Sequence, residues 1–357
     1  MARSRPSRVA ILFMLAAAAE AMSYSPAPEA TRPLPPSSAV TDFRPRLTYA
    51  ITPPNRTTPP ERRRLIAARQ SARVTSLPLD ALLVYDVQDE AARNGDVRPF
   101  AFVPKVDPLS YAFEELQVGA LPTVVYRAVA EQGAQSLCRW LDRLQARGGV
   151  AVLVGAPSRR TPTALSLSEA LSLCRRHAPR LAFGGVVIPE RHHASGDEDA
   201  RVWAKAQHGC GFFVSQTVWS LSIAKQLLLD LRARATREGG QAPHLLLTFS
   251  PCGSQQTLQF TEWLGVALPP AVKRELLAAP DMLTRSIELA FEAFAEIRAF
   301  AAEHGLSIGC NVESVSTRMA EVEASVELVR RIDQLVARDS TAGARALPSS
   351  ARELPVR

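Results

Sequence analysis

Cysteine is scarce in this sequence, and the cysteines that are present form no recognisable pair. The 357 residues include five cysteines, widely spaced and mostly set in apolar runs: Cys138, Cys174, Cys210, Cys252 and Cys310. No CxxC spacing occurs, and an odd number cannot be fully paired. A structural zinc site or a disulfide framework normally needs closely spaced or evenly paired cysteines. The sequence therefore predicts neither, and buried, reduced thiols are the simpler interpretation.

Aromatic residues are also few, at 6% of the sequence, which bears on the meaning of its +7 net charge. Much of the basic excess is arginine within the first 75 residues, and the later chain is nearly balanced. A nucleic-acid-binding domain usually carries a basic stripe with interleaved aromatic residues on its folded part. We therefore expect no nucleic-acid partner. The apolar fraction of 46% is typical of a globular protein with a sizeable core.

The apolar run near the N-terminus is too short to cross a bilayer comfortably. Residues 9–23 read VAILFMLAAAAEAMS, with three arginines before them and a Pro/Ser/Ala-rich segment after them up to about Arg44. A spanning helix needs about 20 apolar residues, so we expect no membrane partner. The pattern is typical of a cleavable signal or transit segment, and an uncleaved extension is the alternative. We expect residues 1–45 to form a leader and residues 339–357 a disordered tail.

Between residues 46 and 338, short apolar runs alternate with amphipathic helical patterns. Eight runs rich in Val, Leu and Phe predict buried strands: 47–52, 81–87, 122–129, 150–155, 183–189, 211–216, 244–249 and 306–313. Helical spacing predicts helices over 61–76, 134–146, 167–177, 198–208, 221–237 and 321–338, with two or three more within 255–303. This alternation predicts a (β/α)8 TIM barrel with a helical insertion between strands 7 and 8.

A doubly wound sheet is the alternative fold, and one missing feature argues against it. That fold normally has a glycine-rich phosphate turn after its first strand. Here the corresponding segment, TPPNRTTPPE, contains no glycine. In a TIM barrel the active site is built from residues just past the C-terminal ends of the strands. Polar residues occur there repeatedly, for example at Asp86, Glu190, Gln216 and Glu313.

Three features of these strand ends occur in the order typical of one enzyme family. They are a double proline after the first strand, a proline–glutamate pair followed by histidine after the fifth, and a lysine eleven residues before a glutamine in the sixth. The residues concerned are Pro53-Pro54, Pro189-Glu190 with His192, and Lys205 with Gln216. Over about residues 47–335 the chain thereby resembles the methylenetetrahydrofolate reductase family. Members of this family are flavin-dependent (β/α)8 barrels that reduce methylenetetrahydrofolate to methyltetrahydrofolate.

The chain departs from this family at two strand ends. The family's catalytic acid lies on the first strand, where this sequence reads Tyr49-Ala50-Ile51-Thr52-Pro53-Pro54, and the place of the acid falls on Ala50. After the fourth strand the family has Arg-Gly-Asp, whereas this sequence has Val154-Gly155-Ala156. These two departures indicate a divergent member.

The resemblance implies a cofactor site for FAD formed by Glu190, His192, Lys205 and Gln216, with NAD(P)H as the source of hydride. His192 and His193 would point in opposite directions in an extended chain, and we expect His192 to face the barrel mouth. Lys205 as a solvated helix residue, and Gln216 as an amide bonded within the protein, are the structural alternatives. No metal site is predicted, because a divalent metal usually needs three or four convergent ligands.

A proton donor must replace the acid that is missing at Ala50. Glu313 is the first choice, because its apolar strand should raise the pKa of the carboxyl and because strand 8 closes the barrel beside strand 1. Asp86, at the end of strand 2, is the second choice. A carboxylate held by backbone donors or by Arg318 is the structural alternative for Glu313, and a polar loop is that for Asp86.

Two functions of different classes are consistent with these observations. One is a methylenetetrahydrofolate reductase-like oxidoreductase of one-carbon and methionine metabolism, with a folate substrate. The other is a non-catalytic folate- or flavin-binding paralogue with a regulatory role. The lost acids favour the second function, and the retained residues favour the first. The sequence leaves the oligomeric state open, a homo-oligomer included.

We predict that the leader directs import into an organelle, a plastid or a mitochondrion, and is removed before about residue 45. Folate chemistry and five unpaired thiols argue against a secreted end-point, and a cytoplasmic location is the alternative. N-terminal sequencing of the native protein tests this. A protein that begins at Met1 or Ala2 would exclude cleavage.

Overall fold

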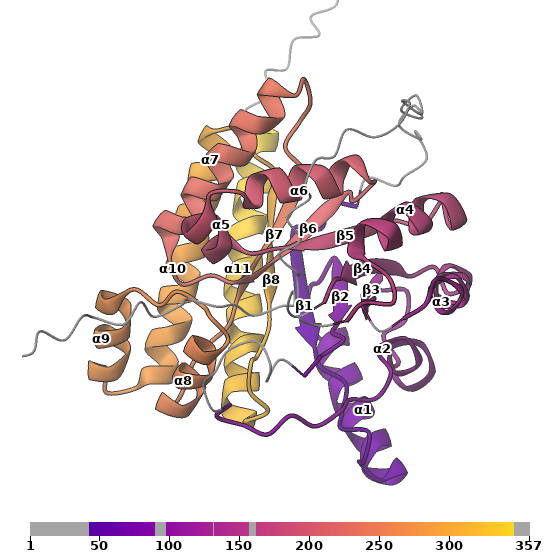
Figure 1. Ribbon diagram of the computed structural model, residues 1–357. Helices are drawn as coiled ribbons and strands as arrows, with labels where there is room; N and C mark the ends of the chain where they lie inside the picture. Colours follow the sequence, from indigo (N-terminus) through magenta and orange to yellow (C-terminus); the bar gives the residue numbers. More distant parts are fainter. Residues whose placement is uncertain (1–42, 90–97, 131, 157–161, 346–357) are drawn as a thin grey trace, which may run out of the picture.

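Eight parallel strands close into a barrel in chain order, so that β1 pairs with β8 as well as with β2 (Figure 1). The computed structural model describes residues 43–89, 98–130, 132–156 and 162–345. The strands are β1 (Leu47–Ile51), β2 (Ala81–Val84), β3 (Thr123–Ala128), β4 (Val150–Val154), β5 (Phe183–Val187), β6 (Phe212–Thr217), β7 (His244–Phe249) and β8 (Ile308–Val312). The predicted (β/α)8 barrel is confirmed.

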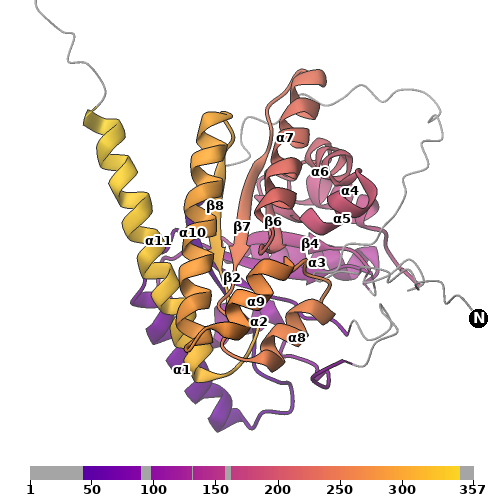
Figure 2. The same ribbon diagram turned by 90° about the vertical axis from the view of Figure 1, so that its left-hand side faces the viewer.

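Helices surround the strands, as Figure 1 shows. Their bounds are α1 (Pro60–Thr75), α2 (Pro108–Ser110) with the π-helical turn η1 (Tyr111–Glu115), α3 (Ala134–Ala146), α4 (Leu167–His177), α5 (Pro189–Ser195), α6 (Glu198–Gln207), α7 (Leu221–Arg237), α8 (Gln255–Trp263), α9 (Pro270–Ala278), α10 (Met282–Glu303) and α11 (Met319–Arg345). The insertion between β7 and β8 is confirmed as α8, α9 and α10. In Figure 2, α8 and α9 lie toward the end to which the arrows of β7 and β8 point.

The strands separate two apolar cores, because successive side chains of a strand point to opposite faces. The inner core fills the barrel with one set of alternating side chains, among them Ala50, Leu83, Val124, Val152, Val186, Val214 and Leu246. The outer core packs the intervening side chains, such as Tyr49 and Phe213, against the helices. Burial on both faces explains why these strands read as continuous apolar runs in the sequence.

The N-terminal end of the barrel is closed by tight packing. The rings of Phe43 and Phe212 lie 4.8 Å apart. The Nε2 atom of His244 lies 2.9 Å from the Pro45 carbonyl oxygen, and its Nδ1 atom lies 2.8 Å from the Ser307 hydroxyl. A Cβ atom on Gly309 would lie 2.3 Å from the same Pro45 oxygen, so the backbone approaches too closely there for any larger residue. The polar residues at the strand ends, such as Glu190, Gln216 and Glu313, lie at the opposite, C-terminal end of the barrel.

Three segments differ from the sequence-based expectation. The segment from Pro189 to His193 was expected to be extended and instead forms α5. Proline is favoured at the first position of a helix, and Gly196, at φ 70°, ends α5 in the left-handed conformation. The pair α2–η1 was not predicted, and α11 continues past residue 338 to Arg345. Residues 1–42 of the predicted leader and residues 346–357 of the predicted tail lie outside the described residues.

None of the helices in the described ranges combines the length and the apolar character that a membrane crossing requires.

Candidate functional site

Glu313 lies at the C-terminal end of the barrel, beside Ala50. The β1–β8 register pairs Tyr49 with Val312, so the next residues along the two strands are Ala50 and Glu313. The Glu313 backbone N–H donates to the Phe249 carbonyl at 3.1 Å, which continues the ladder with β7. The Glu313 side chain is 6% exposed. Barrel closure therefore brings Glu313 next to Ala50, as we expected.

Two tyrosines lie near Glu313 at the mouth. The rings of Tyr85, which follows β2, and Tyr126 in β3 are 4.8 Å apart and meet edge to face at 84°. The Tyr85 hydroxyl is hydrogen-bonded to the Glu313 carboxylate and accepts a bond of 3.0 Å from Asn311 Nδ2. The Tyr126 hydroxyl is buried and makes no hydrogen bond within the described part of the chain. Glu313 and the two tyrosines thus form a compact ionisable group.

A polar chain inside the barrel supports Tyr85. Asn311 Nδ2 also donates to the Thr248 hydroxyl at 3.1 Å, and the Thr48 hydroxyl donates to Asn311 Oδ1 at 3.0 Å. Buried polar groups are stable only when they are hydrogen-bonded, and here each one bonds to a neighbouring strand. This chain fixes the orientation of the Tyr85 hydroxyl toward Glu313.

Burial sets the protonation of this group. Removal from water raises the pKa of Glu313 to about 7, although the hydrogen bond from Tyr85 acts in the opposite direction. Burial and the charge of Glu313 both raise the pKa of Tyr85 and of Tyr126, so both phenols stay protonated. A carboxyl that titrates near neutral pH can donate a proton as well as accept one. Glu313 has the raised pKa that we expected from its apolar surroundings, and its role as the proton donor stays a prediction.

Asp86 is placed differently from Glu313. Tyr85 points into the barrel, so the next side chain leaves the barrel interior, and Asp86 Oδ2 accepts a hydrogen bond of 2.8 Å from the Ala128 backbone N–H. This bond ties the end of β2 to the end of β3. The structure therefore does not bring the two candidate proton donors together, because Asp86 bonds to a backbone N–H outside the barrel interior whereas Glu313 lies beside Tyr85.

Glu190 and Gln216 meet at the segment that follows α8. Gln216 Nε2 donates to the Leu264 carbonyl at 3.0 Å, and Glu190 Oε1 accepts from the Ala267 N–H at 3.4 Å. The other side-chain oxygen of each residue, Glu190 Oε2 and Gln216 Oε1, is buried without a hydrogen-bond partner among the described residues. Burial raises the pKa of Glu190 to about 7, while hydrogen bonds from its own backbone N–H and that of Ala267 lower it.

Local irregularities hold this second pair in place. The β6–β7 register shifts between Val214 and Thr217, around Gln216, and such bulges re-aim side chains next to functional sites. The helix α8 is fixed by Arg98, whose guanidinium lies 5.9 Å from the ring of Phe260 and 5.1 Å from that of Trp263. These cation–π contacts anchor α8. The segment after α8 bonds in turn to Glu190 and Gln216.

His192 and Lys205, the other two residues of the expected cofactor site, lie elsewhere. His192 Nε2 is 2.8 Å from Asp230 Oδ2 on α7, and its Nδ1 is 3.8 Å from Asp199 Oδ1 on α6. The expectation that His192 faces the mouth is wrong, because Pro189 starts a helix that turns the side chain toward α6 and α7. His192 is therefore part of the helical layer.

Lys205 is buried between α6 and the barrel wall. Its Nζ donates to the Val186 carbonyl at 2.6 Å and lies 5.6 Å from the centre of the Phe213 ring. Burial lowers the pKa of Lys205. Phe213 is near the start of β6, whereas Gln216 is near its other end. The structure therefore brings Glu190 and Gln216 together but leaves Lys205 apart from both, and the flavin role of Lys205 and His192 stays a prediction.

Sequence reasoning did not single out Tyr85, Tyr126 or Asn311. The period of two along each strand could have identified the two tyrosines. Tyr85 lies two residues after Leu83, and Tyr126 two residues after Val124, so both belong to the inner face of the barrel. A polar residue at the last inward position of a barrel strand points to the mouth. Within the described residues, no group of three or more His, Cys, Asp and Glu side chains is arranged to hold a metal.

We predict that Glu313 makes unfolding depend on pH. Its pKa is raised from 4.5 to about 7, so between these values the folded protein keeps a proton that the unfolded chain releases. The free energy of unfolding should then fall as pH rises through this window. Glu313→Gln removes the effect, so the variant should gain about 2–3 kcal/mol relative to the parent between about pH 5 and about pH 8.

Denaturant titration at the two pH values measures this gain. Glu303→Gln, at an exposed position on α10, is the matched control and should track the parent at both pH values. If the difference between Glu313→Gln and the parent is the same at both pH values, the pKa of Glu313 is not raised.

A comparison with solved structures identifies a relative of this chain. No protein-family model matches the chain, and no curated protein sequence does. A solved structure of a protein from Clostridium thermocellum is 32% identical with a TM-score of 0.71 and covers 82% of this chain and 96% of its own. That protein is uncharacterized and binds two copies of 5-methyl-5,6,7,8-tetrahydrofolic acid.

Two other structures are far less similar. The first, 2,3-dimethylmalate lyase of the PEP mutase/isocitrate lyase superfamily, is 12% identical with a TM-score of 0.39 over 86% of this chain and 84% of its own. The second, DmoA from Hyphomicrobium sulfonivorans, is 12% identical with a TM-score of 0.48 over 83% and 89%. Neither structure is similar enough to indicate a function for this chain. At its identity and coverage, however, the first relative shows that this chain belongs to the same protein family as the methyltetrahydrofolate-binding protein from Clostridium thermocellum.

Proposed function

We propose that the protein binds a reduced folate at the C-terminal mouth of its barrel. The observation that carries this proposal is a set of buried polar atoms at the strand ends that make no hydrogen bond with any described residue: Glu190 Oε2, Gln216 Oε1 and the Tyr126 hydroxyl. Leaving such an atom buried and unpaired costs about 1–3 kcal/mol. A ligand that bonds to these atoms would recover that energy.

The chemistry of a folate fits these atoms. A pterin ring carries an amino group and ring N–H groups on one edge and a carbonyl oxygen beside them. Carboxylate and amide oxygens such as those of Glu190 and Gln216 accept from N–H groups, and a phenol such as Tyr126 can donate to a carbonyl. The relative from Clostridium thermocellum, which binds 5-methyltetrahydrofolic acid, supports the same ligand class for this chain.

We predict that Tyr126→Phe weakens folate binding without weakening the fold. The hydroxyl has no hydrogen-bond partner among the residues that the structure describes, so removing it should leave the free energy of unfolding unchanged or slightly raised. If the hydroxyl bonds to the ligand, its loss should raise the Kd for 5-methyltetrahydrofolate roughly tenfold. Calorimetric titration of the full chain measures the Kd.

Tyr111→Phe is the matched control. The Tyr111 hydroxyl donates to Gln70 Oε1 at 2.6 Å, so its removal should cost about 1 kcal/mol of stability and leave the folate Kd unchanged. A parent protein that does not bind 5-methyltetrahydrofolate, or a Tyr126→Phe variant that binds it as tightly as the parent, would refute the proposed folate site.

A second candidate function is reduction of 5,10-methylenetetrahydrofolate to 5-methyltetrahydrofolate, as in the family that the sequence resembles. The specific observation that favours it is Glu313, a carboxyl that titrates near neutral pH next to Ala50. The reaction needs a proton on N10 of the folate, so that the bond between N10 and the bridging carbon breaks and leaves an iminium at N5 for hydride to reduce. Glu313 can hold that proton at the mouth, and Tyr85 orients it.

The cofactors FAD and NAD(P)H belong to this candidate through the resemblance alone. Of the four residues implied for the flavin, Glu190 and Gln216 lie at the mouth with open acceptors. His192 and Lys205 instead contact Asp230 and the Val186 carbonyl. The four residues together do not fit one flavin, so a flavin bound here would need other contacts.

We predict that, if the reductase function holds, Glu313→Gln slows the folate half-reaction by about 10²–10⁴-fold, the range expected for loss of a general acid. Reduction of added FAD by NAD(P)H should be spared, because that step does not need the proton of Glu313. Asp86→Asn is the control and should react like the parent, since Asp86 bonds to the Ala128 backbone. Stopped-flow absorbance of the flavin follows the two half-reactions separately.

The outcomes separate the candidates. A defect in Asp86→Asn in place of Glu313→Gln would assign the proton to Asp86. A parent protein that binds 5-methyltetrahydrofolate but shows neither half-reaction would make the non-catalytic, regulatory folate-binding function the correct one.

A further inference from the structure

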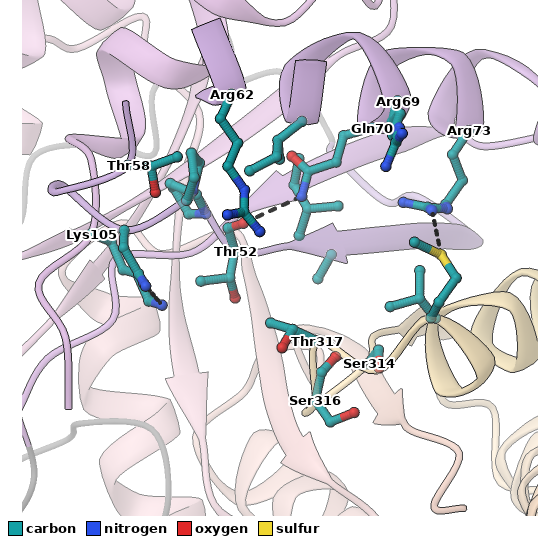
Figure 3. A pocket seen from close by; sticks show the side chains of 18 of the residues that line it. Thr52, Thr58, Arg62, Arg69, Gln70, Arg73, Lys105, Ser314, Ser316 and Thr317 are labelled. Atoms are coloured by element: carbon teal, nitrogen blue, oxygen red, sulfur yellow. Dashed lines mark hydrogen bonds between the residues drawn. The ribbon is translucent and has the colours of Figure 1, made fainter. Parts of the chain in front are cut away.

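A cavity of about 680 Å³ lies beside the mouth, between α1 and the segment that joins β8 to α11. We call it the basic cavity. One wall is formed by the end of β1, the proline-rich loop after it and α1, and the facing wall by residues 314–317 and the start of α11. Figure 3 shows Arg62, Arg69 and Arg73 on the first wall and Ser314, Ser316 and Thr317 on the second. Ala50 lines the basic cavity, which therefore adjoins the neighbourhood of Glu313.

The charge of the basic cavity is of one sign. Its lining includes Arg62, Arg69, Arg73 and Lys105, and none of its described residues is Asp or Glu. Arg73 is 3.4 Å from Glu323 Oε1, a carboxylate on α11 that is 60% exposed, and such a pair contributes little. Lys105 Nζ donates to the neutral Asn55 Oδ1 at 2.6 Å. Burial and the charge of Arg98 lower the pKa of Lys105.

The two remaining cations are unpaired in the described part of the chain. The guanidinium groups of Arg62 and Arg69 make neither an ion pair nor a hydrogen bond with any residue in the described ranges. A guanidinium binds a carboxylate through two parallel hydrogen bonds, which makes arginine well suited to recognise carboxylates. Side-chain hydroxyls in the lining, such as those of Thr58 and Thr317, can donate further bonds. The basic cavity is therefore suited to an anionic ligand.

The spacing of the cations indicates the shape of that ligand. An α-helix rises about 1.5 Å per residue, so Arg62, Arg69 and Arg73 are spread over roughly 16 Å of α1. A single phosphate is small and would need its donors to converge on one point. An extended ligand with several carboxylates matches a row of cations. A folate ends in such a group, a glutamyl dicarboxylate that further γ-linked glutamates can extend.

We propose that the basic cavity binds the glutamyl carboxylates of a folate. This proposal rests on the proposed folate function and assigns the substrate class as a reduced folate whose tail carries several carboxylates. The tail can come from the folate bound at the mouth, because Ala50 borders both places, or from a second folate molecule. In both cases Arg62 and Arg69 bind carboxylates.

Binding of a pterin-free probe tests the basic cavity independently of the mouth. The full chain is titrated with p-aminobenzoyl-γ-triglutamate by calorimetry. The parent should bind it, and Arg62→Gln and Arg69→Gln should each raise its Kd roughly tenfold, as expected for loss of one charge-assisted contact. Arg64→Gln is the matched control: it lies on the same helix, removes the same charge and does not line the basic cavity. It should bind like the parent.

Tyr126→Phe separates this proposal from the folate site at the mouth. It should bind the pterin-free probe like the parent, so the basic cavity can be confirmed even if the mouth proves not to bind folate. The basic cavity proposal is overturned if the parent does not bind the probe, or if Arg64→Gln weakens binding as much as Arg62→Gln. It is also overturned if inorganic phosphate binds as tightly as the probe with the same dependence on Arg62.

Titration with pentaglutamyl 5-methyltetrahydrofolate identifies the source of the tail. One binding event per chain that both Arg62→Gln and Tyr126→Phe weaken supports a single folate that spans the mouth and the basic cavity. Two events, each weakened by one of the variants, support a second folate molecule. Equal Kd values for the monoglutamyl and pentaglutamyl forms, both unaffected by Arg62→Gln, would overturn the proposal.

Discussion

The pairing of β1 with β8 is the constraint on which the candidate site depends. This pairing closes the barrel, joins Thr48 to Asn311 in register and so brings together residues that are more than 250 positions apart in the chain. Without closure, Ala50 and Glu313 would lie on opposite edges of an open sheet. The same closure places α1 beside the segment before α11 and thereby forms both walls of the basic cavity. The mouth and the basic cavity are two consequences of one row of backbone hydrogen bonds.

A closed barrel also explains how two carboxyls can stay buried at the mouth. Burying a carboxylate is costly, and the group responds by raising its pKa, as Glu313 and Glu190 do. Each is held by contacts that survive protonation, a tyrosine hydroxyl for Glu313 and backbone N–H groups for Glu190. The rigid barrel keeps both carboxyls buried despite the free-energy cost of burial. The mouth therefore holds groups that can exchange protons near neutral pH.

The strand-by-strand order of the fold could be predicted from the sequence, because strands buried on both faces read as apolar runs and their C-terminal ends share one side of a barrel. The same reasoning placed Glu313 beside Ala50. It did not place His192, because a proline and a left-handed glycine converted the segment after β5 into a helix. It also could not show that the guanidinium groups of Arg62 and Arg69 have no partner among the described residues. Whether these arginines are paired depends on which side chains α11 presents across the basic cavity. The sequence pattern of α1 alone contains no information about the side chains of α11.

Ala50 connects the two proposed sites. Ala50 belongs both to the inner core beside Glu313 and to the lining of the basic cavity. A carboxylate at this position would place a negative charge where the mouth meets a row of arginines, and it would repel the carboxylates of the proposed folate tail. Alanine adds no such charge, and the nearest acid is Glu313 on the neighbouring strand, whose side chain points into the barrel and does not belong to the cavity lining. In the described part of the chain, an acid therefore lies at the mouth while the charged residues that line the basic cavity are all positive.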